Sequence, residues 1–315
     1  MILLINEDVN ENMSIFLYNS LTKKGAECRI ISQDSLPVKN NLTLYTKDSK
    51  LLGELFIDGE RIDIKDINAI YTRFSTSKLK ENISEISKEE IEQERQIYFD
   101  TFFEYIDAMV INKNKSQFPN SSKLYQSSII KNYGFNIPNS IISNDIDEVK
   151  EFIEAKKDKG IIYKSASAER SKVQNFKKED FEKLEFIKYC PHLFQECVHG
   201  ADIRVHALAT GETFACQIGS ETSDYRYDAD RNVEIIDLPQ KIKEACVKMT
   251  LDFGLYLSGI DLRLTPDGEY YCFEVNPSPA FSWYEDITGM PISDAIAEMM
   301  IHSDKYKNLA VRRFL

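Results

Sequence analysis

The chain has 315 residues, of which 43% are hydrophobic and 29% are charged, and its formal net charge is −12. A chain of this length buries a substantial core and divides into two or three compact units, and its composition is ordinary for a globular protein. The negative charge argues against a general binder of nucleic acid or of anionic membranes. The N-terminus lacks the long apolar run and the basic flank of a signal peptide, and no stretch approaches the roughly 20 apolar residues of a membrane span. We therefore expect a cytoplasmic protein with no nucleic-acid or membrane partner.

Cysteine and histidine do not predict a metal centre. The six cysteines are scattered without a Cys-x-x-Cys pair, and the four histidines have no zinc-ligand spacing. Buried thiols in a reducing cytosol are the default for this distribution, and we expect no zinc site.

The first part of the chain has the pattern of a small α/β domain. An apolar run at residues 1–5 predicts a strand, a helical pattern follows, and residues 27–32 predict a second strand. This order of strand, helix and strand is typical of a parallel sheet. No Gly-x-Gly-x-x-Gly follows the first strand, so a dinucleotide-binding site loses its main support. Further strands are expected at residues 51–57 and 67–71, and Arg73 after the last of them lies either at the rim of a cleft or in an ordinary surface ion pair.

A long helix is expected at residues 87–110, because this stretch is acidic at first and then rich in aromatic residues that suit a core. The polar stretch 112–122 is typical of a linker. We therefore place an N-terminal α/β domain at residues 1–112, a central subdomain at 113–190 and a C-terminal subdomain at 191–315.

The rest of the chain alternates helices with strands and contains no internal repeat. The elements expected in it, in chain order, are a helix at 123–133, a strand at 140–142, a helix from 145 to about 157, a strand at 160–164, a helix at 179–186, a strand at 192–198, a hairpin of 202–209 with 212–219, a helix at 239–253, a hairpin within 259–279 and a last helix at 292–301. Two polar stretches, residues 165–174 and 220–232, predict flexible loops.

The hairpin within residues 259–279 is the most informative stretch. A tight turn at Pro266-Asp267-Gly268 joins its two strands. Side chains alternate faces along a strand, so one face of each strand is apolar. The apolar side chains that we expect to meet a core are Ile260, Leu262, Leu264, Phe273 and Val275.

The other face of this hairpin carries Asp261, Glu274 and Asn276. Two carboxylates and an amide oxygen on rigid strands suit a hard cation that keeps some water and also takes phosphate oxygens, which means Mg²⁺. A solvated strand face with ordinary polar residues would have the same spacing. The spacing alone leaves these two interpretations about equal.

Other residues suit the binding of a nucleotide. Lys123 begins a helix and Lys164 ends a strand, so two lysines on different elements can bind successive phosphates, although a single lysine is most often simply exposed. The strand that contains Glu196 offers backbone groups beside apolar side chains, as an adenine site does, or Glu196 is an ordinary strand residue. Arg226, in the second polar loop, either reaches a reacting phosphate or has no such role.

Asp202, Arg204 and His206 share one face of the following strand. An acid beside a ribose and an arginine beside a transferring phosphate would be sensible uses of that face. The alternative is a cross-strand ion pair.

The order of these features along the chain is more specific than any one of them. A lysine at a helix start, a lysine at a strand end, a Gln-Glu strand, Asp-Ile-Arg, a loop arginine and then Asp with Glu-x-Asn resembles the ATP-grasp superfamily. Within it, the sequence is similar to the branch of ribosomal-protein glutamate ligases and graspetide (microviridin-type) peptide ligases. The match covers residues 121–301, and Glu274-Val-Asn-Pro is its most specific element. The resemblance implies an α/β protein with an ATP-grasp fold, α+β in its ATP-binding part, after a small N-terminal parallel-sheet domain.

The resemblance also implies a role for each matching residue. Lys123, Lys164 and Arg226 would bind the phosphates of ATP, and Arg204 would bind the acyl phosphate. Arg204 and Arg226 are thus the expected catalytic residues.

For the rest of the nucleotide, the resemblance places Glu196, Cys197 and Val198 at the adenine edge and Asp202 at the ribose. The three oxygen-bearing side chains of the hairpin would hold two Mg²⁺ ions, with Glu274 bridging them. Two departures stand out: the loop after Lys164 has no glycine, and an aromatic run at residues 281–284 replaces a small-residue turn, which favours a peptide or larger organic acid.

The chemistry that the resemblance implies is ADP-forming ligation. A peptide or small-molecule carboxylate attacks the γ-phosphoryl group of ATP, and an amine or hydroxyl acceptor then displaces phosphate, giving an amide or ester. The two polar loops are lid candidates, and His206 or Glu285 is a candidate acceptor base. Related ligases associate through their ATP-grasp domains, so the resemblance is compatible with a dimer or tetramer and leaves the oligomeric state open. A peptide- or protein-modifying ligase is favoured over a small-molecule ligase of the amino-acid or peptide-cofactor type, and over a nucleotide-binding regulator that has lost catalysis.

Overall fold

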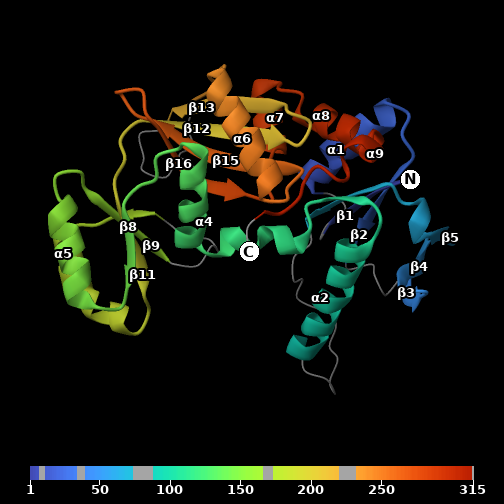
Figure 1. Ribbon diagram of the computed structural model, residues 1–315, viewed down its shortest axis with the longest axis horizontal. Helices are drawn as coiled ribbons and strands as arrows, with labels where there is room; N and C mark the ends of the chain where they lie inside the picture. The colour runs from blue at the N-terminus through green and yellow to red at the C-terminus, as the bar shows by residue number, and fades with distance from the viewer. Residues whose placement is uncertain (7–10, 34–39, 74–87, 166–172, 220–231, 314–315) are drawn as a thin grey trace.

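The computed structural model describes residues 1–6, 11–33, 40–73, 88–165, 173–219 and 232–313. Its strands form four sheets within these ranges. In Figure 1 the central sheet lies on the left, the large C-terminal sheet at the top and the N-terminal strands on the right. None of the helices in these ranges is long and apolar enough to cross a membrane.

The N-terminal domain contains the predicted parallel sheet. Its strands, in the order in which they pair, are β2 (Cys28–Ser32), β1 (Ile2–Asn6), β6 (Ala69–Arg73) and β7 (Met109–Ile111). Helix α1 (Asn12–Lys23) connects β1 to β2, and both neighbours of β1 run parallel to it. All five residues of β1 are buried, as expected for a continuous apolar strand between two covered faces.

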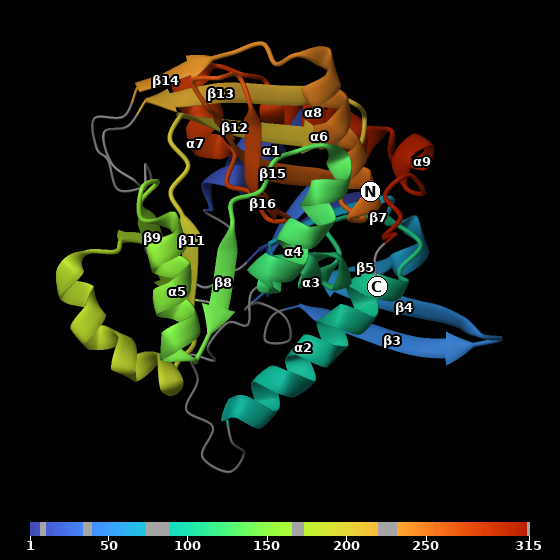
Figure 2. The same ribbon diagram turned by 60° about the vertical axis from the view of Figure 1, so that its left-hand side comes forward.

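A second sheet in this domain was not expected in full. It is antiparallel and comprises β3 (Asn41–Lys47), β4 (Lys50–Ile57) and β5 (Glu60–Asp63), followed by a short 3₁₀ helix, η2 (Ile64–Asp66). Only β4 was predicted, because β3 is mostly exposed and its sequence is mainly polar. Figure 2 shows the β3–β4 hairpin projecting away from the rest of the molecule.

The long helix predicted at residues 87–110 is wrong in its last part. Helix α2 (Lys88–Tyr105) ends earlier, and the chain then forms β7. A short apolar run fits a buried strand as well as a buried helix turn, so periodicity did not separate the two. The aromatic residues Phe99, Phe102 and Phe103 are buried in the core, as predicted.

The predicted polar linker after β7 is instead packed into the structure. It contains the short helices η3 (Asn114–Gln117) and α3 (Phe118–Ser121) and begins with Asn112, which is 3% exposed. The Asn112 side-chain nitrogen donates to the carbonyl oxygens of Leu257 and Pro277, each at 2.6 Å, and its oxygen accepts from the backbone N–H of Tyr256 at 2.8 Å. One amide therefore connects the N-terminal domain to the C-terminal sheet.

Replacing Asn112 by alanine is expected to lower the free energy of unfolding by about 3 kcal/mol, because each buried backbone group left unpaired costs about 1–3 kcal/mol. Urea denaturation monitored by circular dichroism measures this change. Asn232→Ala is the matched control, since Asn232 is exposed and should change stability by less than about 0.5 kcal/mol. If the two variants were equally stable, the bonds of Asn112 would not matter to the fold.

The central subdomain is built on an antiparallel sheet. Its strands, in pairing order, are β10 (Gln174–Asn175), β9 (Ile161–Ser165), β11 (His192–Glu196) and β8 (Ser140–Ser143), and it carries α5 (Ile146–Lys156) and the 3₁₀ helix η5 (Lys178–Lys188). Asp145 caps α5 by accepting from the N–H of Asp147 at 2.9 Å. Strand β11 pairs with β8 and β9, so it belongs to this sheet although the expected C-terminal subdomain began at residue 191.

The C-terminal sheet has the pairing order β14 (Asn232–Ile235), β13 (Thr213–Gly219), β12 (Ala201–Leu208), β15 (Leu257–Leu264) and β16 (Tyr270–Asn276). Helices α4 (Lys123–Ile130), extended by the 3₁₀ turn η4 (Lys131–Tyr133), and α6 (Gln240–Asp252) share a hydrophobic core with this sheet. The chain ends in α7 (Ser282–Thr288), α8 (Ile292–Ile301) and α9 (Ser303–Tyr306).

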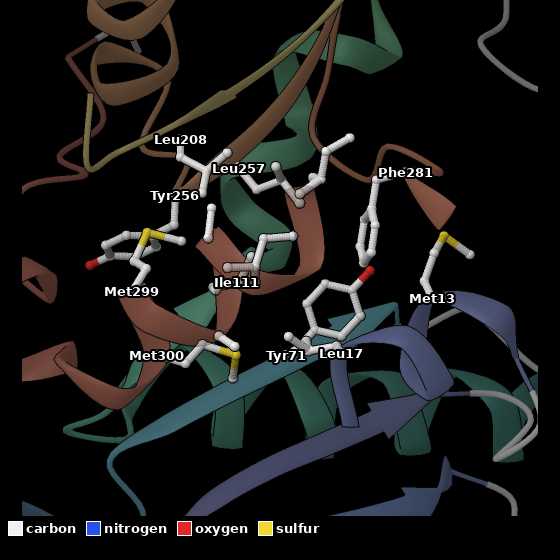
Figure 3. Packing of buried hydrophobic residues seen from close by; sticks show 14 of the residues in the cluster. Met13, Leu17, Tyr71, Ile111, Leu208, Tyr256, Leu257, Phe281, Met299 and Met300 are labelled. Atoms are coloured by element: carbon white, nitrogen blue, oxygen red, sulfur yellow. The ribbon is translucent and has the colours of Figure 1, made fainter. Parts of the chain in front are cut away.

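A single apolar cluster joins the N-terminal domain to the C-terminal sheet. Figure 3 shows Leu17, Tyr71 and Ile111 of the first domain packed with residues such as Phe281 and Met300 of the last. The central subdomain has a separate core around α5, η5 and its own sheet. The N-terminal domain and the C-terminal sheet therefore form one packed body. The central subdomain lies beside it and has a separate hydrophobic core.

Candidate active site

A row of charged side chains crosses three adjacent strands on one face of the C-terminal sheet. Arg204 on β12 lies opposite Asp261 on β15, which in turn lies opposite Glu274 on β16. Residues directly opposite one another on antiparallel strands share a face. Asn276 is opposite Gly259 in the next row of the same face. The structure thus brings together the predicted metal ligands and the predicted catalytic Arg204.

Each carboxylate in this row has a cationic neighbour. Arg204 Nη1 is 2.6 Å from Asp261 Oδ1, and Lys123 Nζ is 3.7 Å from Glu274 Oε2. The side chains of Asp261 and Glu274 are 28% and 26% exposed, so a hydrated cation and a phosphate can reach them. Lys123 stands at the first residue of α4, as predicted.

The predicted alternation along β16 is wrong at Phe273. The register shifts between Asp261 and Leu262, because a β-bulge adds one residue to β16 at this point. Cys272 takes the core position beside Val275, and both are 0% exposed. The Phe273 ring instead lies 5.1 Å from the guanidinium carbon of Arg263.

Arg204 is held in a fixed position. It is 5% exposed, and its guanidinium carbon lies 5.8 Å from the centre of the Tyr284 ring. Gly259 leaves room for it: a Cβ added there would lie 2.5 Å from Arg204 Cζ and 2.6 Å from Pro279 Cβ. A glycine inside a strand often marks such a close approach. The sequence contains this sign, but its meaning depends on the neighbouring strand.

Both candidate acceptor bases, His206 and Glu285, are engaged in contacts within the protein. His206 is 0% exposed and meets the Tyr284 ring edge-on, and burial, with the charge of Arg204, lowers the pKa of this imidazole well below its usual range. Burial raises the pKa of Glu285, whose carboxylate accepts from the N–H and hydroxyl of Ser293 at the start of α8, at 2.8 and 2.6 Å. Neither side chain is available to an incoming acceptor in this arrangement.

The aromatic run at residues 281–284 is part of the core, which corrects its interpretation as a substrate-facing feature. Phe281 is 0% exposed, Tyr284 is 8% exposed, and Trp283 packs against the same cluster. The tight spacing of these aromatics reflects packing between the two end domains. It therefore gives no support to a large substrate.

The predicted adenine edge lies at the end of β11. The Glu196 carboxylate, 2% exposed, accepts from the backbone and side chain of Asn139 at 3.1 and 2.9 Å, and lies 3.2 Å from Lys159 Nζ. Burial raises the pKa of this carboxyl, but the bonds from Asn139 and Lys159 outweigh burial and leave the pKa below its ordinary value. The side chain of Glu196 thus anchors β11 to neighbouring segments.

Two of those backbone groups already have partners. The N–H of Cys197 donates to the carbonyl of Gly160 at 2.9 Å, and the carbonyl of Val198 accepts from Arg263 at 2.7 Å. Arg263 also donates to Asp202, with Nε 2.9 Å from Oδ1, so the cross-strand ion pair left open by the sequence is present. The role of Asp202 at a ribose stays a prediction.

The other predicted phosphate ligands lie elsewhere. Lys164 stands on β9 opposite Leu193, in the central sheet. Arg226 lies outside the described residues, as do residues 166–172 and 220–231 of the two lid candidates.

Arg73 is ion-paired with Glu11 at 3.0 Å, and it also donates to the carbonyl of Pro279 at 3.2 Å, three residues after Asn276.

The donor set of the hairpin suits Mg²⁺. Within the described ranges no three His, Cys, Asp or Glu side chains gather closely enough to enclose a metal ion. Asp261, Glu274 and Asn276 supply two carboxylates and one amide oxygen, which leaves positions for water and phosphate oxygens, as Mg²⁺ prefers. Carboxylates with this exposure fit a cation that arrives together with a nucleotide.

A family model described as the ATP-grasp domain matches residues 120–281, just over half of the chain. The chain belongs to the ATP-grasp family. This confirms the predicted fold class and, at the level of the family, the prediction of an ATP-dependent ligase. No curated protein matches this ATP-grasp chain.

Solved structures of other ATP-grasp proteins share the whole fold. The macrocyclase MdnC from Microcystis aeruginosa, bound with the precursor peptide MdnA, is 24% identical, with a TM-score of 0.83 over 96% of this chain and 99% of that one. A RiPP-associated ATP-grasp ligase from Chryseobacterium gregarium, in complex with ADP and a leader and core peptide, is 23% identical, with a TM-score of 0.79 over 99% of each chain. The ligase PsnB, complexed with a minimal precursor, Mg and ADP, is 22% identical, with a TM-score of 0.80 over 95% of this chain and 96% of that one. At these identities the likeness shows a shared fold, including the N-terminal domain.

Sequence reasoning missed three residues that contact the candidate site. Gly259, Asn112 and Gln126 all lie against the strand or loop that carries the predicted metal ligands. Asn112 and Gln126 contact backbone atoms far away in sequence, and no local pattern indicates such contacts.

Proposed function

We propose that this ATP-grasp protein is an ADP-forming ligase that joins a peptide carboxylate to an amine or hydroxyl, through an acyl phosphate. The observation that carries the proposal is the row of Arg204, Asp261 and Glu274 across three strands, with Lys123 beside it. Cations and carboxylates in one row suit a phosphoryl group and its metal. The named relatives, which are bound to precursor, leader or core peptides, support a peptide as substrate.

In this proposal Asp261, Glu274 and Asn276 would hold Mg²⁺, as two ions. When bound, Mg²⁺ neutralises charge on the phosphate oxygens of ATP. Lys123 on α4 would bind a phosphate from one side. The amide of Asn276 is kept in place because its oxygen accepts from the N–H of Ser278 at 2.8 Å.

The remaining contacts to ATP would come from β9 of the central subdomain, from β12 of the C-terminal sheet and from the segment between β13 and β14. Lys164 and Arg226 would bind phosphates, and Asp202 would lie at the ribose. Because Cys197 N–H and Val198 C=O already have partners, the base would be read by the carbonyl of Glu196 and the N–H of Val198.

Phosphoryl transfer then requires a fixed cation beside the acyl oxygen. The substrate carboxylate attacks the γ-phosphorus, the bond to the β-phosphate oxygen breaks, and ADP leaves. The amine or hydroxyl next attacks the acyl carbon, loses its proton, and displaces phosphate. Arg204, fixed by Asp261 and Tyr284, would stabilise the acyl phosphate without having to reorganise during the reaction.

The direct test is to incubate the protein with Mg-ATP and candidate peptides rich in Thr, Ser, Lys, Asp and Glu. Each bond formed should remove one water from the peptide mass and release one ADP and one phosphate. Mild alkali distinguishes the products, because it cleaves an ester and spares an amide. A reaction with the non-hydrolysable analogue AMPPNP is the control. Formation of AMP, or steady ADP release with no change in any peptide mass, would contradict the proposal.

A further inference from the structure

The side chain of Gln126 on α4 forms two hydrogen bonds with one residue of β16. Its Nε2 donates to the carbonyl of Val275 at 3.0 Å, and its Oε1 accepts from the N–H of Val275, also at 3.0 Å. Only one orientation of the amide satisfies both bonds. Gln126 is 3% exposed and Val275 is 0% exposed, so water does not readily take the place of this amide.

Val275 lies between two of the predicted metal ligands, Glu274 and Asn276. Strand β16 lies at the edge of its sheet, and among the described residues no named strand pairs with its outward backbone groups. Nearer the turn, the backbone of Asn136 covers this edge by bonding to Tyr270 and Cys272. At Val275 the covering group is the amide of Gln126. At Val275 a side chain therefore takes the place of a neighbouring strand. The backbone of Val275 in turn influences where the side chains of Glu274 and Asn276 point.

Helix α4 connects this contact to the predicted phosphate lysine. Lys123 and Gln126 are three residues apart, so they lie on the same side of α4. Lys123 reaches Glu274, and Gln126 reaches the next residue of the strand. Ile129 and Ile130 anchor the other end of α4 in the core of the C-terminal sheet. One helix thus fixes both the phosphate lysine and the backbone of the metal ligands.

We propose that Gln126 is a positioning residue for the magnesium site, where it fixes the backbone between Glu274 and Asn276 so that both side chains face the nucleotide. This proposal rests on the proposed function, since it requires that Mg²⁺ and ATP bind on this face. It adds that affinity for the metal, beyond the stability of the fold, depends on an amide that contacts neither the metal nor ATP.

The test is the Mg²⁺ dependence of AMPPNP binding to the full chain, measured by calorimetry with no peptide present. Gln126→Met keeps the volume of the side chain and removes both hydrogen bonds. We expect it to raise the Mg²⁺ concentration for half-maximal AMPPNP binding by about 10–100-fold, as is typical when a group that orients a metal ligand is lost. Binding of AMPPNP measured in EDTA should change by less than about twofold, because the lysines and the adenine edge are unaffected.

Gln126→Asn is the second variant, in case the methionine folds poorly. It keeps an amide in the buried position but is one methylene too short to reach Val275, so it should shift the Mg²⁺ dependence in the same direction by a smaller factor. Ser128→Ala is the control on the same helix, since the Ser128 hydroxyl bonds only within α4. Thr250→Val is the control for stability, because it removes buried hydrogen bonds to Cys246 and Ser258 away from the site.

The outcomes separate this proposal from the proposed function. If the unaltered protein binds AMPPNP with no dependence on Mg²⁺, the metal assignment fails and the role of Gln126 falls with it. Gln126 is only structural if the unaltered protein depends on Mg²⁺ and both Gln126 variants match it within about twofold, whether or not they melt at lower temperature, as is expected of Thr250→Val; the proposed function then survives. A shift in both variants that neither control shows supports the proposal.

Discussion

Replacing Glu274 by glutamine is expected to abolish turnover and leave the fold intact. The substitution keeps the shape of the side chain but removes the negative charge that lies opposite Asp261 and 3.7 Å from Lys123 Nζ. Electrostatic stabilisation by a bound metal contributes several kcal/mol to a transition state, so we expect a loss of about a thousandfold or more in kcat. ADP release in the presence of a peptide substrate measures the loss, and the far-ultraviolet circular dichroism spectrum reports the fold.

Glu269→Gln is the matched control for this experiment. Glu269 immediately precedes β16 and is exposed, and its carboxylate accepts from the side chain of Asn136 at 2.9 Å. It undergoes the same chemical change outside the row of charges, and its turnover should stay within about twofold of the unaltered protein. Turnover by Glu274→Gln at a comparable level would remove Glu274 from the metal site and with it the proposed mechanism.

The elements that sequence patterns predicted well are those whose pattern is local. The β15–β16 hairpin was predicted from the alternation in its sequence and from its Pro-Asp-Gly turn, and the two strands do pair antiparallel. The bulge at Phe273 was missed, because an extra residue in one strand is visible only against the register of its partner. Strand β7 was missed because three apolar residues after a helix have no period of their own.

The residues of the candidate site also differ in whether a local pattern or a tertiary contact determines their position. The predicted oxygen donors and Lys123 meet on one face, because a strand or a helix start determines where each points. Glu196 was predicted at the adenine edge, but its carboxylate bonds to Asn139 and Lys159 from other segments. Such contacts arise from the tertiary fold, and a single sequence contains no sign of them.

Side chains from three different segments bind alternate residues at the end of β16 and just after it. Gln126 on α4 binds the backbone of Val275, Asn112 after β7 binds the carbonyl of Pro277, and Arg73 at the end of β6 binds the carbonyl of Pro279. Asn276 lies between the first two. The N-terminal domain therefore helps to fix a predicted metal ligand, which explains physically why it is packed so closely against the C-terminal sheet.

Gly259→Ala is expected to lower kcat by about a hundredfold, since displacing a catalytic group by about 1 Å costs about that much. The new Cβ would stand 2.5 Å from Arg204 Cζ and 2.6 Å from Pro279 Cβ, which no real packing allows. The guanidinium must shift away from Asp261 and the Tyr284 ring, and the acyl phosphate would lose its fixed cation. Steady-state kinetics measure kcat, and calorimetry with Mg-AMPPNP should show nucleotide binding largely retained, because the metal ligands themselves remain.

Gly219→Ala is the matched control, because it tests whether replacing another glycine of this sheet by alanine also lowers kcat. Gly219 ends β13, and an added Cβ there would only touch Asn232 at 3.6 to 3.7 Å, an ordinary contact. This control should keep kcat within about twofold, because surface substitutions of this kind change little. If Gly259→Ala behaved in the same way, Arg204 would tolerate displacement, and a residue outside this row would have to stabilise the acyl phosphate. A large loss confined to Gly259→Ala would instead tie catalysis to the position of one guanidinium group, which depends on the absence of a single methyl group from the neighbouring strand.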